Sequence, residues 1–483
     1  MSTDIRLLEP RGIWNCFADL NAVPRPSKME QRVIAFAKAF GEGLGLPTHV
    51  DEAGNVIIRK PATAGMEARQ TVVLQGHLDM VHQKNASTKF DFVNQGIEAY
   101  VDGDWVYARG TTLGADNGIG VASIMAILAS KDIPHPAIEA LFTVDEETGM
   151  TGAMELKGGL LHGTVMLNLD TEDDRELTIG CAGGIDVTGS GTYRKEAVSG
   201  LSGYKIILNG LKGGHSGMDI HLGRGNANKL MNRTLLEVDA RFGARIHSLD
   251  GGSLRNAIPR ESVAIVGLSA AHVDGFLKFI AEEGKTLQAE YHSTDPGLQL
   301  QAAACASPST VLEADFQYKL LRVLAGCPNG IYRMSPDIQG LVQTSNNLAR
   351  VTLADAQYSL QCLTRSSVDS EKMDLARSIA AVFELCGAST TLEGGYPGWT
   401  PRPDSKIVQL MTALYRDAFG HDPNVNACHA GLECGILGQK YPEMEMISFG
   451  PNIVGAHSPD EKVQISSVQK FWGLLLKTLE RIP

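Results

Sequence analysis

Histidine and carboxylate side chains follow four separate apolar runs of this chain. The runs are "TVVLQ" (71–75), "IEALFTV" (138–144), "TVMLNL" (164–169) and "MEMISFG" (444–450). The residues that follow them are His77, Asp79, Glu146, Glu147, Asp170 and, after a short loop, His457. Imidazole nitrogen and carboxylate oxygen together suit zinc or a similar divalent ion. The pattern therefore predicts metal chemistry, with Asp116 in "TTLGADNG" as a further carboxylate.

The acidic run "DEE" (145–147) places two glutamates side by side. If the run continues the preceding strand, the side chains of Glu146 and Glu147 point in opposite directions, because side chains alternate along a strand. Two like charges at one strand end also cost free energy unless a positive group offsets them. The run therefore predicts a positive partner and different surroundings for the two carboxylates.

The four apolar runs have the length and composition of buried strands. A buried helix is predicted over 118–130, and a final helix over 467–482. Strands separated by helices indicate a sheet that is covered by helices on both faces. In open α/β sheets, ligands bind beyond the carboxyl ends of the strands, which is where the histidines and carboxylates stand.

The middle of the chain has a different pattern, with strands and longer amphipathic helices from residue 204 onward. Two stretches, 263–291 and 358–393, both run strand, helix, strand, and form a candidate internal repeat. A stretch rich in proline and glycine, 393–405, is expected to link this region back to the first domain.

The fold class predicted from these patterns is α/β with two domains, since 483 residues are too many for one ordinary domain. The first domain has a mixed, largely parallel sheet sandwiched by helices, and is made from residues 1–185 and 393–483. The second is an α+β domain, residues 186–392, inserted into the first.

Composition and charge exclude several classes of function. The formal net charge of −12 argues against nucleic acid or an anionic membrane as the main partner. No apolar run is long enough to span a bilayer, and "MSTDIRLLEPRGIW" lacks the features of a signal peptide. Eight scattered cysteines without a CxxC pair indicate reduced thiols, and so a cytoplasmic protein.

Other catalytic motifs fit less well. "GADNGIG" and "GLKGGHSG" lack the ending of a phosphate-binding loop and the glycine spacing of a dinucleotide site. A hydrolase with Cys434 or Ser216 as nucleophile lacks an elbow motif and an acidic residue to orient the histidine.

Five motifs resemble the di-zinc metallopeptidase family that includes carboxypeptidase G, aminoacylase and carnosinase. In order, they are "QGHLDM", "GADNG", "VDEETG", "NLDTE" and "GAHSPDE". The resemblance covers essentially the whole chain, and all five motifs are intact. "HAGLECG" and "GGHSGMDIH" are similar to the aminoacyl-histidine dipeptidase branch. The family implies a catalytic domain and an inserted lid domain. The lid would form a homodimer, or its internal repeat would take the place of a partner within a monomer.

The resemblance also implies a role for each motif residue. The metal ligands would be His77 and Asp170 for one ion, Glu147 and His457 for a second, and Asp116 as a bridge between them. The ions would be zinc, with cobalt or manganese as alternatives. Asp79 would orient the imidazole of His77. A cis peptide bond would follow the bridging residue, at Asp116–Asn117.

The metal pair would be the positive partner of the acidic run. Glu147 would turn to the metal, while Glu146 would turn to the water that both ions share, as general base. Glu146 would take the proton of that water and deliver it to the leaving amine.

Residues outside the ligand set are implied to bind the substrate. His215 would donate to the oxyanion, either within its own chain or across a dimer interface. Asn256 and Arg365 match positions that hold the substrate carboxylate and carbonyl, and an arginine can pair with a carboxylate through two hydrogen bonds. Glu433 would meet the free amino group of a dipeptide.

The leading hypothesis is a cytoplasmic metallo-dipeptidase that prefers Xaa-His dipeptides, including carnosine-like peptides. An N-acyl-amino-acid deacylase of the same family is one alternative, and Glu433 favours the dipeptidase because a free amine carries a positive charge. A non-catalytic metal-binding scaffold is another alternative, and the presence of Glu146 argues against it.

Overall fold

The computed structural model describes residues 4–483, which divide into two compact units. The first unit holds the chain up to Gly180, then Trp399–Ala427 and Leu432–Pro483. The second unit holds Cys181–Gly398 and Cys428–Gly431. The chain thus passes between the units at 180/181 and 398/399, five and six residues from the expected positions, and again briefly at 427/428 and 431/432.

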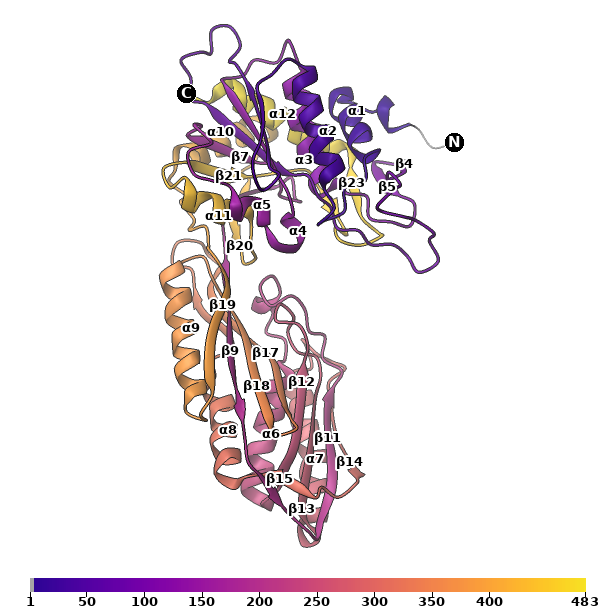
Figure 1. Ribbon diagram of the computed structural model, residues 1–483, viewed down its shortest axis with the longest axis vertical. Helices are drawn as coiled ribbons and strands as arrows, with labels where there is room; N and C mark the ends of the chain where they lie inside the picture. The colour runs from indigo at the N-terminus through magenta and orange to yellow at the C-terminus, as the bar shows by residue number, and fades with distance from the viewer. Residues whose placement is uncertain (1–3) are drawn as a thin grey trace. The chain divides into compact units, whose positions relative to one another are not determined.

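The first unit is built on an eight-stranded mixed sheet (Figure 1). In spatial order its strands are β1 (Thr48–Val50), β2 (Val56–Lys60), β6 (Ile138–Thr143), β3 (Val72–His77), β7 (Val165–Asn168), β21 (Glu445–Ser448), β8 (Glu176–Cys181) and β20 (Asn424–Cys428). The neighbours β6, β3, β7 and β21 run parallel to one another, while β2 and β8 pair with them antiparallel. The four parallel strands are the four apolar runs, and they end at one edge of the sheet.

Helices and a small second sheet complete this unit. The helices are α1 (Arg11–Asn21), α2 (Gln31–Gly43), α3 (Ala115–Ala129), α4 (Glu146–Gly149), α5 (Thr151–Glu155), α10 (Lys406–Phe419), α11 (Glu433–Lys440) and α12 (Ile465–Arg481), after a 3-10 turn η1 (Ile5–Leu7). The small sheet has the order β22 (Ile453–Val454), β23 (Lys462–Gln464), β5 (Trp105–Ala108) and β4 (Ala99–Asp102). α3 packs on β3 and is buried along almost its whole length, which agrees with its nearly all-apolar sequence.

The second unit contains a nine-stranded antiparallel sheet. Its spatial order is β14 (Gln299–Cys305), β11 (Leu201–Asn209), β13 (Ser262–Ser269), β12 (Arg245–Gly252), β17 (Val342–Ala354), β18 (Gln357–Ser366), β9 (Gly183–Thr192) and β19 (Ser389–Tyr396), with β16 (Gly330–Met334) paired to β17. Four helices pack on it: α6 (Ala227–Phe242), α7 (Val273–Glu290), α8 (Ala314–Gly326) and α9 (Asp369–Glu384) (Figure 1). Its short elements are β10 (Lys195–Ala197), β15 (Thr310–Leu312), η2 (Ile220–Leu222) and η3 (Ala270–His272).

The strand order of the second unit reveals a duplication. One half has the spatial order β14-β11-β13-β12, and the other has β17-β18-β9-β19. Counted along the chain within each half, and from the outer edge of the sheet to its centre, both orders read fourth, first, third, second. The halves join where β12 pairs antiparallel with β17. The repeat predicted at 263–291 and 358–393 is therefore confirmed in its order of elements, because β13 and β18 are each followed by a helix and an edge strand. The end of the first stretch was wrong, since residues up to Glu290 belong to α7 and the edge strand β14 lies beyond it, at Gln299–Cys305.

Fold class and cysteine state agree with the sequence, whereas the expected linker was partly wrong. Residues 393–396 belong to β19 rather than to a connection, because an edge strand tolerates the glycine pair at 394–395 together with a register shift. The eight cysteines all lie within the described residues, and none of them forms a disulfide bond. Among residues 4–483, no helix is both long enough and apolar enough to cross a membrane.

Candidate active site

The side chain of Asp116 lies between two histidines of the first unit. Its Oδ1 atom is 3.2 Å from Nε2 of His77, and its Oδ2 atom is 3.2 Å from Nε2 of His457. His77 is the last residue of β3, whereas His457 comes from the loop after β22. Each oxygen of one carboxylate thus faces a different imidazole, which is the arrangement that a bridging ligand requires.

A second carboxylate completes each side of this arrangement. Asp170 Oδ1 lies 3.4 Å from Nε2 of His77, and Glu147 Oε2 lies 3.0 Å from Nε2 of His457. The five residues form two groups of three with the spacing that could hold a metal ion, and Asp116 belongs to both groups. The structure therefore brings all five predicted ligands together.

The "DEE" run is a turn and not the end of a strand, so the expected alternation of side chains was wrong. β6 ends at Thr143, Asp145 has a left-handed backbone (φ 56°), and α4 begins at Glu146. Neighbouring side chains of a helix differ in direction by about a quarter turn. The carboxylates of Glu146 and Glu147 both remain within ligand distance of His77, so both lie on the same side of the cluster as His77.

Asp79 connects His77 with this turn. It lies two residues beyond the end of β3, and its Oδ1 atom is 3.4 Å from Nδ1 of His77. Its carboxylate also accepts hydrogen bonds from the backbone N–H groups of Glu146 (3.0 Å) and Glu147 (3.3 Å), and from the hydroxyl of Ser27 (2.8 Å). Asp79 thereby fixes the position of the His77 imidazole relative to the backbone of Glu146 and Glu147. The expected cis peptide bond at Asp116–Asn117 is present.

The cluster contains more carboxylates than positive groups. Burial raises the pKa of Asp170 to about 6, against the opposing charge of His77. Hydrogen bonds to Asp116 and Glu147 raise the pKa of His457 to about 11. Burial also raises the pKa of Glu146 well above its usual value, and the charges of nearby carboxylates add to this effect. All three shifts indicate a site in which additional positive charge is stabilising.

Glu433 is a buried carboxylate at the first residue of α11, in the same unit. Its Oε2 atom accepts hydrogen bonds from Gln75 (2.6 Å) and Thr143 (2.7 Å), while its Oε1 atom is buried without a hydrogen-bond partner. Burial raises its pKa to about 7. Both neighbours belong to the parallel strands β3 and β6, which places Glu433 against the sheet that carries the metal-ligand cluster.

His215 and Arg365 lie together in the second unit. Nη2 of Arg365 is 3.5 Å from Nε2 of His215. The backbone N–H groups of Gly217 (3.2 Å) and Met218 (3.0 Å) donate to Nδ1 of His215, so the proton of the neutral ring resides on Nε2. Burial and the charge of Arg365 lower the pKa of His215 to about 4. Two N–H donors, one of them cationic, therefore converge at this place.

Further residues of the second unit surround this pair. Tyr396 accepts a hydrogen bond from Nη1 of Arg365 (2.7 Å), and the backbone carbonyl of Asn256 accepts one from Ser216 (2.8 Å). The side chain of Asn256 is exposed. His429 is buried, with its Nε2 atom 2.7 Å from the hydroxyl of Ser345, and burial lowers its pKa to about 3.

A family model and full-length relatives match this chain. The model of "Peptidase family M20/M25/M40" matches residues 73–481. The chain belongs to this peptidase family. The resemblance inferred from the five motifs is thereby confirmed, and the M20/M25/M40 fold accounts for both units.

Two relatives extend over nearly the whole chain. The cytosol non-specific dipeptidase of Escherichia coli is 42% identical over 482 residues, which cover 100% of this chain and 99% of the relative. The crystal structure of aminoacylhistidine dipeptidase from Vibrio alginolyticus is 43% identical, with a TM-score of 0.93, and covers 100% of this chain and 98% of the other. An aminopeptidase structure from Bacillus cereus is 16% identical with a TM-score of 0.58 over 98% of this chain, and shows the shared fold alone.

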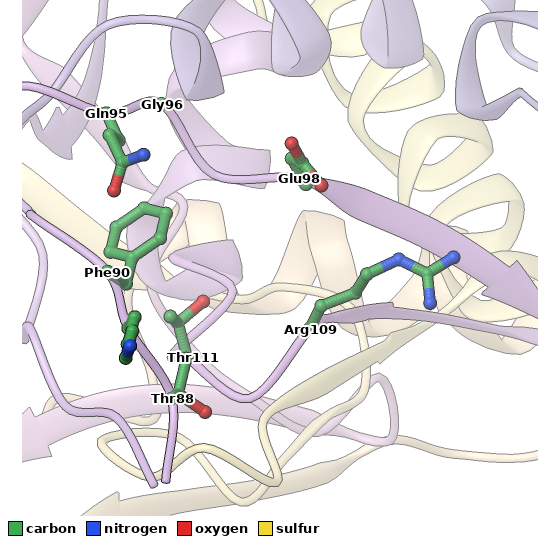
Figure 2. A pocket seen from close by; sticks show the side chains of 8 residues that line it. Thr88, Phe90, Gln95, Gly96, Glu98, Arg109 and Thr111 are labelled. Carbon is green, nitrogen blue, oxygen red and sulfur yellow. The ribbon is translucent and has the colours of Figure 1, made fainter. Parts of the chain in front are cut away.

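Sequence reasoning missed two polar residues that contact predicted site residues, one in each unit. Ser27 and Tyr396 contact predicted residues through side-chain hydrogen bonds, yet neither stands in one of the five motifs. A pocket of about 420 Å³ was also not foreseen (Figure 2). Its walls come from residues 88–111 and include Phe90 and Arg109, and none of the predicted site residues lines it. No motif marks these residues, since they become neighbours only through folding.

Proposed function

We propose that this protein is a metal-dependent dipeptidase with two divalent ions bound by the five clustered ligands. The observation that carries the proposal is Asp116, whose two oxygens each face a histidine at 3.2 Å. We assign His77 and Asp170 to one ion, and Glu147 and His457 to the other. Zinc suits a set of imidazoles and carboxylates, and cobalt or manganese would also be accepted.

The residues present fit such a pair of ions. Glu147 Oε1 and Asp170 Oδ1 are both buried without a hydrogen-bond partner. An unpaired buried carboxylate oxygen costs free energy, which coordination to a cation would remove. When bound, the ions would polarise the peptide carbonyl and lower the pKa of a water molecule. The remaining chemistry falls to side chains of the protein.

Glu146 is the proposed general base. It lies within ligand distance of His77 and Glu147 but is not needed to complete either group of three that contains Asp116. Its carboxylate would take a proton from the attacking water and return it to the nitrogen of the leaving amine. Asp79 would keep the ring of His77 oriented, because it accepts from the same turn that carries Glu146.

His215 and Arg365 are proposed to act on the negative parts of the substrate. The Nε2–H group of neutral His215 would donate to the carbonyl oxygen as it becomes an oxyanion. Arg365 and Asn256 would hold the C-terminal carboxylate. The supporting observation is that His215 and Arg365 present hydrogen-bond donors to one place, which suits an anionic group.

Glu433 is proposed to pair with the substrate's free amino group. Its Oε1 atom is buried and has no hydrogen-bond partner within the described residues, so an ammonium would remove an unfavourable situation. A site that recognises a carboxylate at one end and an ammonium at the other selects short substrates. Dipeptides are therefore the proposed substrate class, as the names of both full-length relatives suggest. A preference for C-terminal histidine rests on the name of the Vibrio relative.

We also propose that the protein is a cytoplasmic homodimer formed through the second unit. The location follows the name of the Escherichia coli relative. Exposed apolar side chains on β16 support the dimer, namely Ile331, Tyr332 and Met334, with 43%, 55% and 43% of their surface exposed. Sedimentation of the purified protein would measure the mass, and a monomer at all concentrations would contradict the dimer.

A substrate panel tests the proposed function. Chelator-stripped enzyme should be inactive, and restoring zinc, cobalt or manganese should recover hydrolysis of dipeptides far better than of tripeptides or N-acetylated amino acids. Carnosine-like peptides, which have one extra methylene before the carbonyl, belong in the panel. A preference for N-acetylated amino acids would indicate a deacylase instead, whereas full activity without metal would reject the metal-dependent proposal.

A further inference from the structure

The carboxylate of Glu461 binds the loop that carries Asp116. Its Oε2 atom accepts hydrogen bonds from the backbone N–H groups of Leu113 (2.7 Å) and Gly114 (2.9 Å). Its Oε1 atom accepts from those of Ala115 (2.7 Å) and Asp116 (3.2 Å). One side chain, only 2% exposed, thus binds four consecutive backbone donors that end at the proposed bridging ligand.

These contacts replace a cap that α3 lacks. The residue before the helix is Gly114, which has no side chain to accept a hydrogen bond and has a left-handed backbone (φ 68°). Asp116 itself departs from helical geometry (φ −81°, ψ 113°). The first N–H groups of a helix have no partner within it, and a negative charge there is favourable. The conformation of the Asp116 loop therefore depends on an acceptor from elsewhere, and Glu461 provides it.

Glu461 belongs to the same short loop as His457. This loop is compact, because Glu461 N–H donates to the carbonyl of Ser458 (3.1 Å) and Ser458 N–H donates to the carbonyl of Gly455 (3.2 Å). These two hydrogen bonds restrict the backbone conformation between His457 and Glu461. Binding of Glu461 to the Asp116 loop therefore also determines where His457 stands relative to Asp116.

The Asp116 loop is held independently on another side by Arg25, a side chain only 1% exposed. Arg25 donates to the carbonyl of Gly114, and also to the carbonyls of Leu78 (3.1 Å) and Asp79 (3.0 Å) beyond β3. A Cβ atom at Gly114 would lie 2.5 Å from Nη2 of Arg25, so the packing requires glycine. The Asp116 loop thus stays attached to the segment after His77 even when the contact with Glu461 is lost.

We propose that Glu461 is a positioning residue that holds His457 in register with Asp116 and so sets the affinity for the ion bound by Glu147 and His457. Loss of its carboxylate releases the His457 loop, while Arg25 keeps Asp116 in place beside His77. The effect on metal binding is therefore selective for one of the two ions. This inference rests on the proposed assignment of the metal ligands.

The test measures metal affinity in proteins that retain one site. The full-length variant His77→Ala should keep only the Glu147 and His457 site, and His457→Ala only the other. Glu461→Gln is added to each, because glutamine keeps the shape but turns an N–H₂ group toward backbone donors. Zinc affinity is measured by competition with a chromophoric chelator, and the visible spectrum of the cobalt-loaded protein reports ligand geometry.

We expect Glu461→Gln to weaken zinc binding about 10- to 100-fold in the His77→Ala background, the usual effect of a residue that orients a ligand. In the His457→Ala background the change should be several-fold smaller. Glu445→Gln is the matched control. Glu445 also accepts from backbone N–H groups at a helix start, those of Lys406 (3.4 Å) and Ile407 (3.0 Å), but contacts no proposed ligand. It should leave zinc affinity unchanged.

Three results would overturn the inference in distinguishable ways. Equal weakening in both backgrounds, or none in either, would remove the positioning role while leaving the metal assignment standing. If His77→Ala and His457→Ala each still bound two ions, the metal assignment would be wrong and the inference would fail with it. Thermal unfolding of the metal-free variants checks folding, and if Glu461→Gln does not fold, Glu461→Asp, which is one methylene shorter, takes its place in the same comparison.

Discussion

The two units carry clusters of opposite chemical character. In the first unit, four of the proposed ligands, two carboxylates and two imidazoles, gather around the carboxylate of Asp116, and two carboxylate oxygens of this set are buried without a hydrogen-bond partner. In the second unit, His215 and Arg365 present hydrogen-bond donors to one place. The first cluster has acceptors in excess and requires cations, whereas the second has donors in excess and suits an anion.

In the proposed function, this difference allows the first cluster to activate a peptide and the second cluster to hold it. A dipeptide offers a polarisable carbonyl and a free carboxylate, and these make different demands on a protein. Carboxylates and imidazoles can hold the metal ions that polarise the carbonyl. Side chains that donate hydrogen bonds can hold the negative charge of the carboxylate. Substitutions that affect one cluster should therefore leave the function of the other measurable, which gives the following predictions.

The largest effect should come from Asp116→Ala, since each of its oxygens faces a different histidine. Metal analysis of the purified variant should show that both ions are lost, and an activity assay should detect no dipeptide hydrolysis. Asp295→Asn is a control, because Asp295 is a buried carboxylate of the second unit that accepts from the backbone of Lys212 and Gly225. Retention of two ions by Asp116→Ala would show that it does not bridge them.

The next prediction separates the base from its neighbour. Glu146→Gln should keep its metal and lose about 100-fold or more in kcat, the usual contribution of general acid–base catalysis. Glu147→Gln should weaken metal binding instead, because Glu147 lies 3.0 Å from His457. Metal content and kcat of the two variants give the answer. The reverse pattern would exchange the roles of the two glutamates.

His215→Ala should leave both ions in place and lower kcat by about 100- to 1,000-fold, through loss of a donor to the oxyanion. His247→Ala is the matched control, since His247 is a partly buried histidine of the same unit. The pKa of His215 is lowered to about 4, so the ring is neutral throughout the neutral range and the loss should not vary with pH there. A loss of metal in His215→Ala would contradict a role confined to the substrate.

Mixing two inactive proteins asks which chain supplies His215. If it serves the site of a partner subunit, Glu146→Gln and His215→Ala proteins should recover activity together, since the mixed dimer has one site that is intact in both respects. Absence of recovery after confirmed subunit exchange would mean that each chain completes its own site. In that case one half of the duplicated sheet of the second unit would take the place of a partner subunit.

The smallest effect is expected for Glu433→Gln, which keeps the hydrogen-bonding shape and removes a charge. We expect about a tenfold loss of kcat/KM for free dipeptides and little change for N-acetylated amino acids, because only the free amine carries a charge to be paired. The ratio of the two kcat/KM values is the measurement. An equal loss for both substrates would show that Glu433 does not recognise the amine.

The metal cluster could be predicted from sequence because parallel strands end at a common edge. His77 ends a strand of that kind, and Glu147 and Asp170 follow two others, so this pattern predicts from the sequence that the three residues lie together. The alternation of strands and helices predicted a mixed, largely parallel sheet in the first unit, but the order of its strands was found only in the folded chain. The directions of the Glu146 and Glu147 side chains could not be predicted from a strand pattern, because the left-handed backbone at Asp145 ends the extended chain and a helix begins at Glu146.

The second cluster could not be derived in this way. Its members come from a loop, from β18 and from the edge strand β19, which become neighbours only through the register of an antiparallel sheet. No helix or strand periodicity in the sequence marks Tyr396 or the hydrogen bonds to Nδ1 of His215. The contact between Glu461 and the Asp116 loop joins residues 345 positions apart, so it too was found only in the folded chain.

The measurement that tests the account most directly is the metal content of the wild-type protein as activity returns. Chelator-stripped protein is titrated with zinc while bound ions per chain and dipeptide hydrolysis are recorded together. The account predicts two ions per chain at saturation, with full activity only when both are bound. Full activity with one ion per chain, or with none, would contradict a site bridged by Asp116.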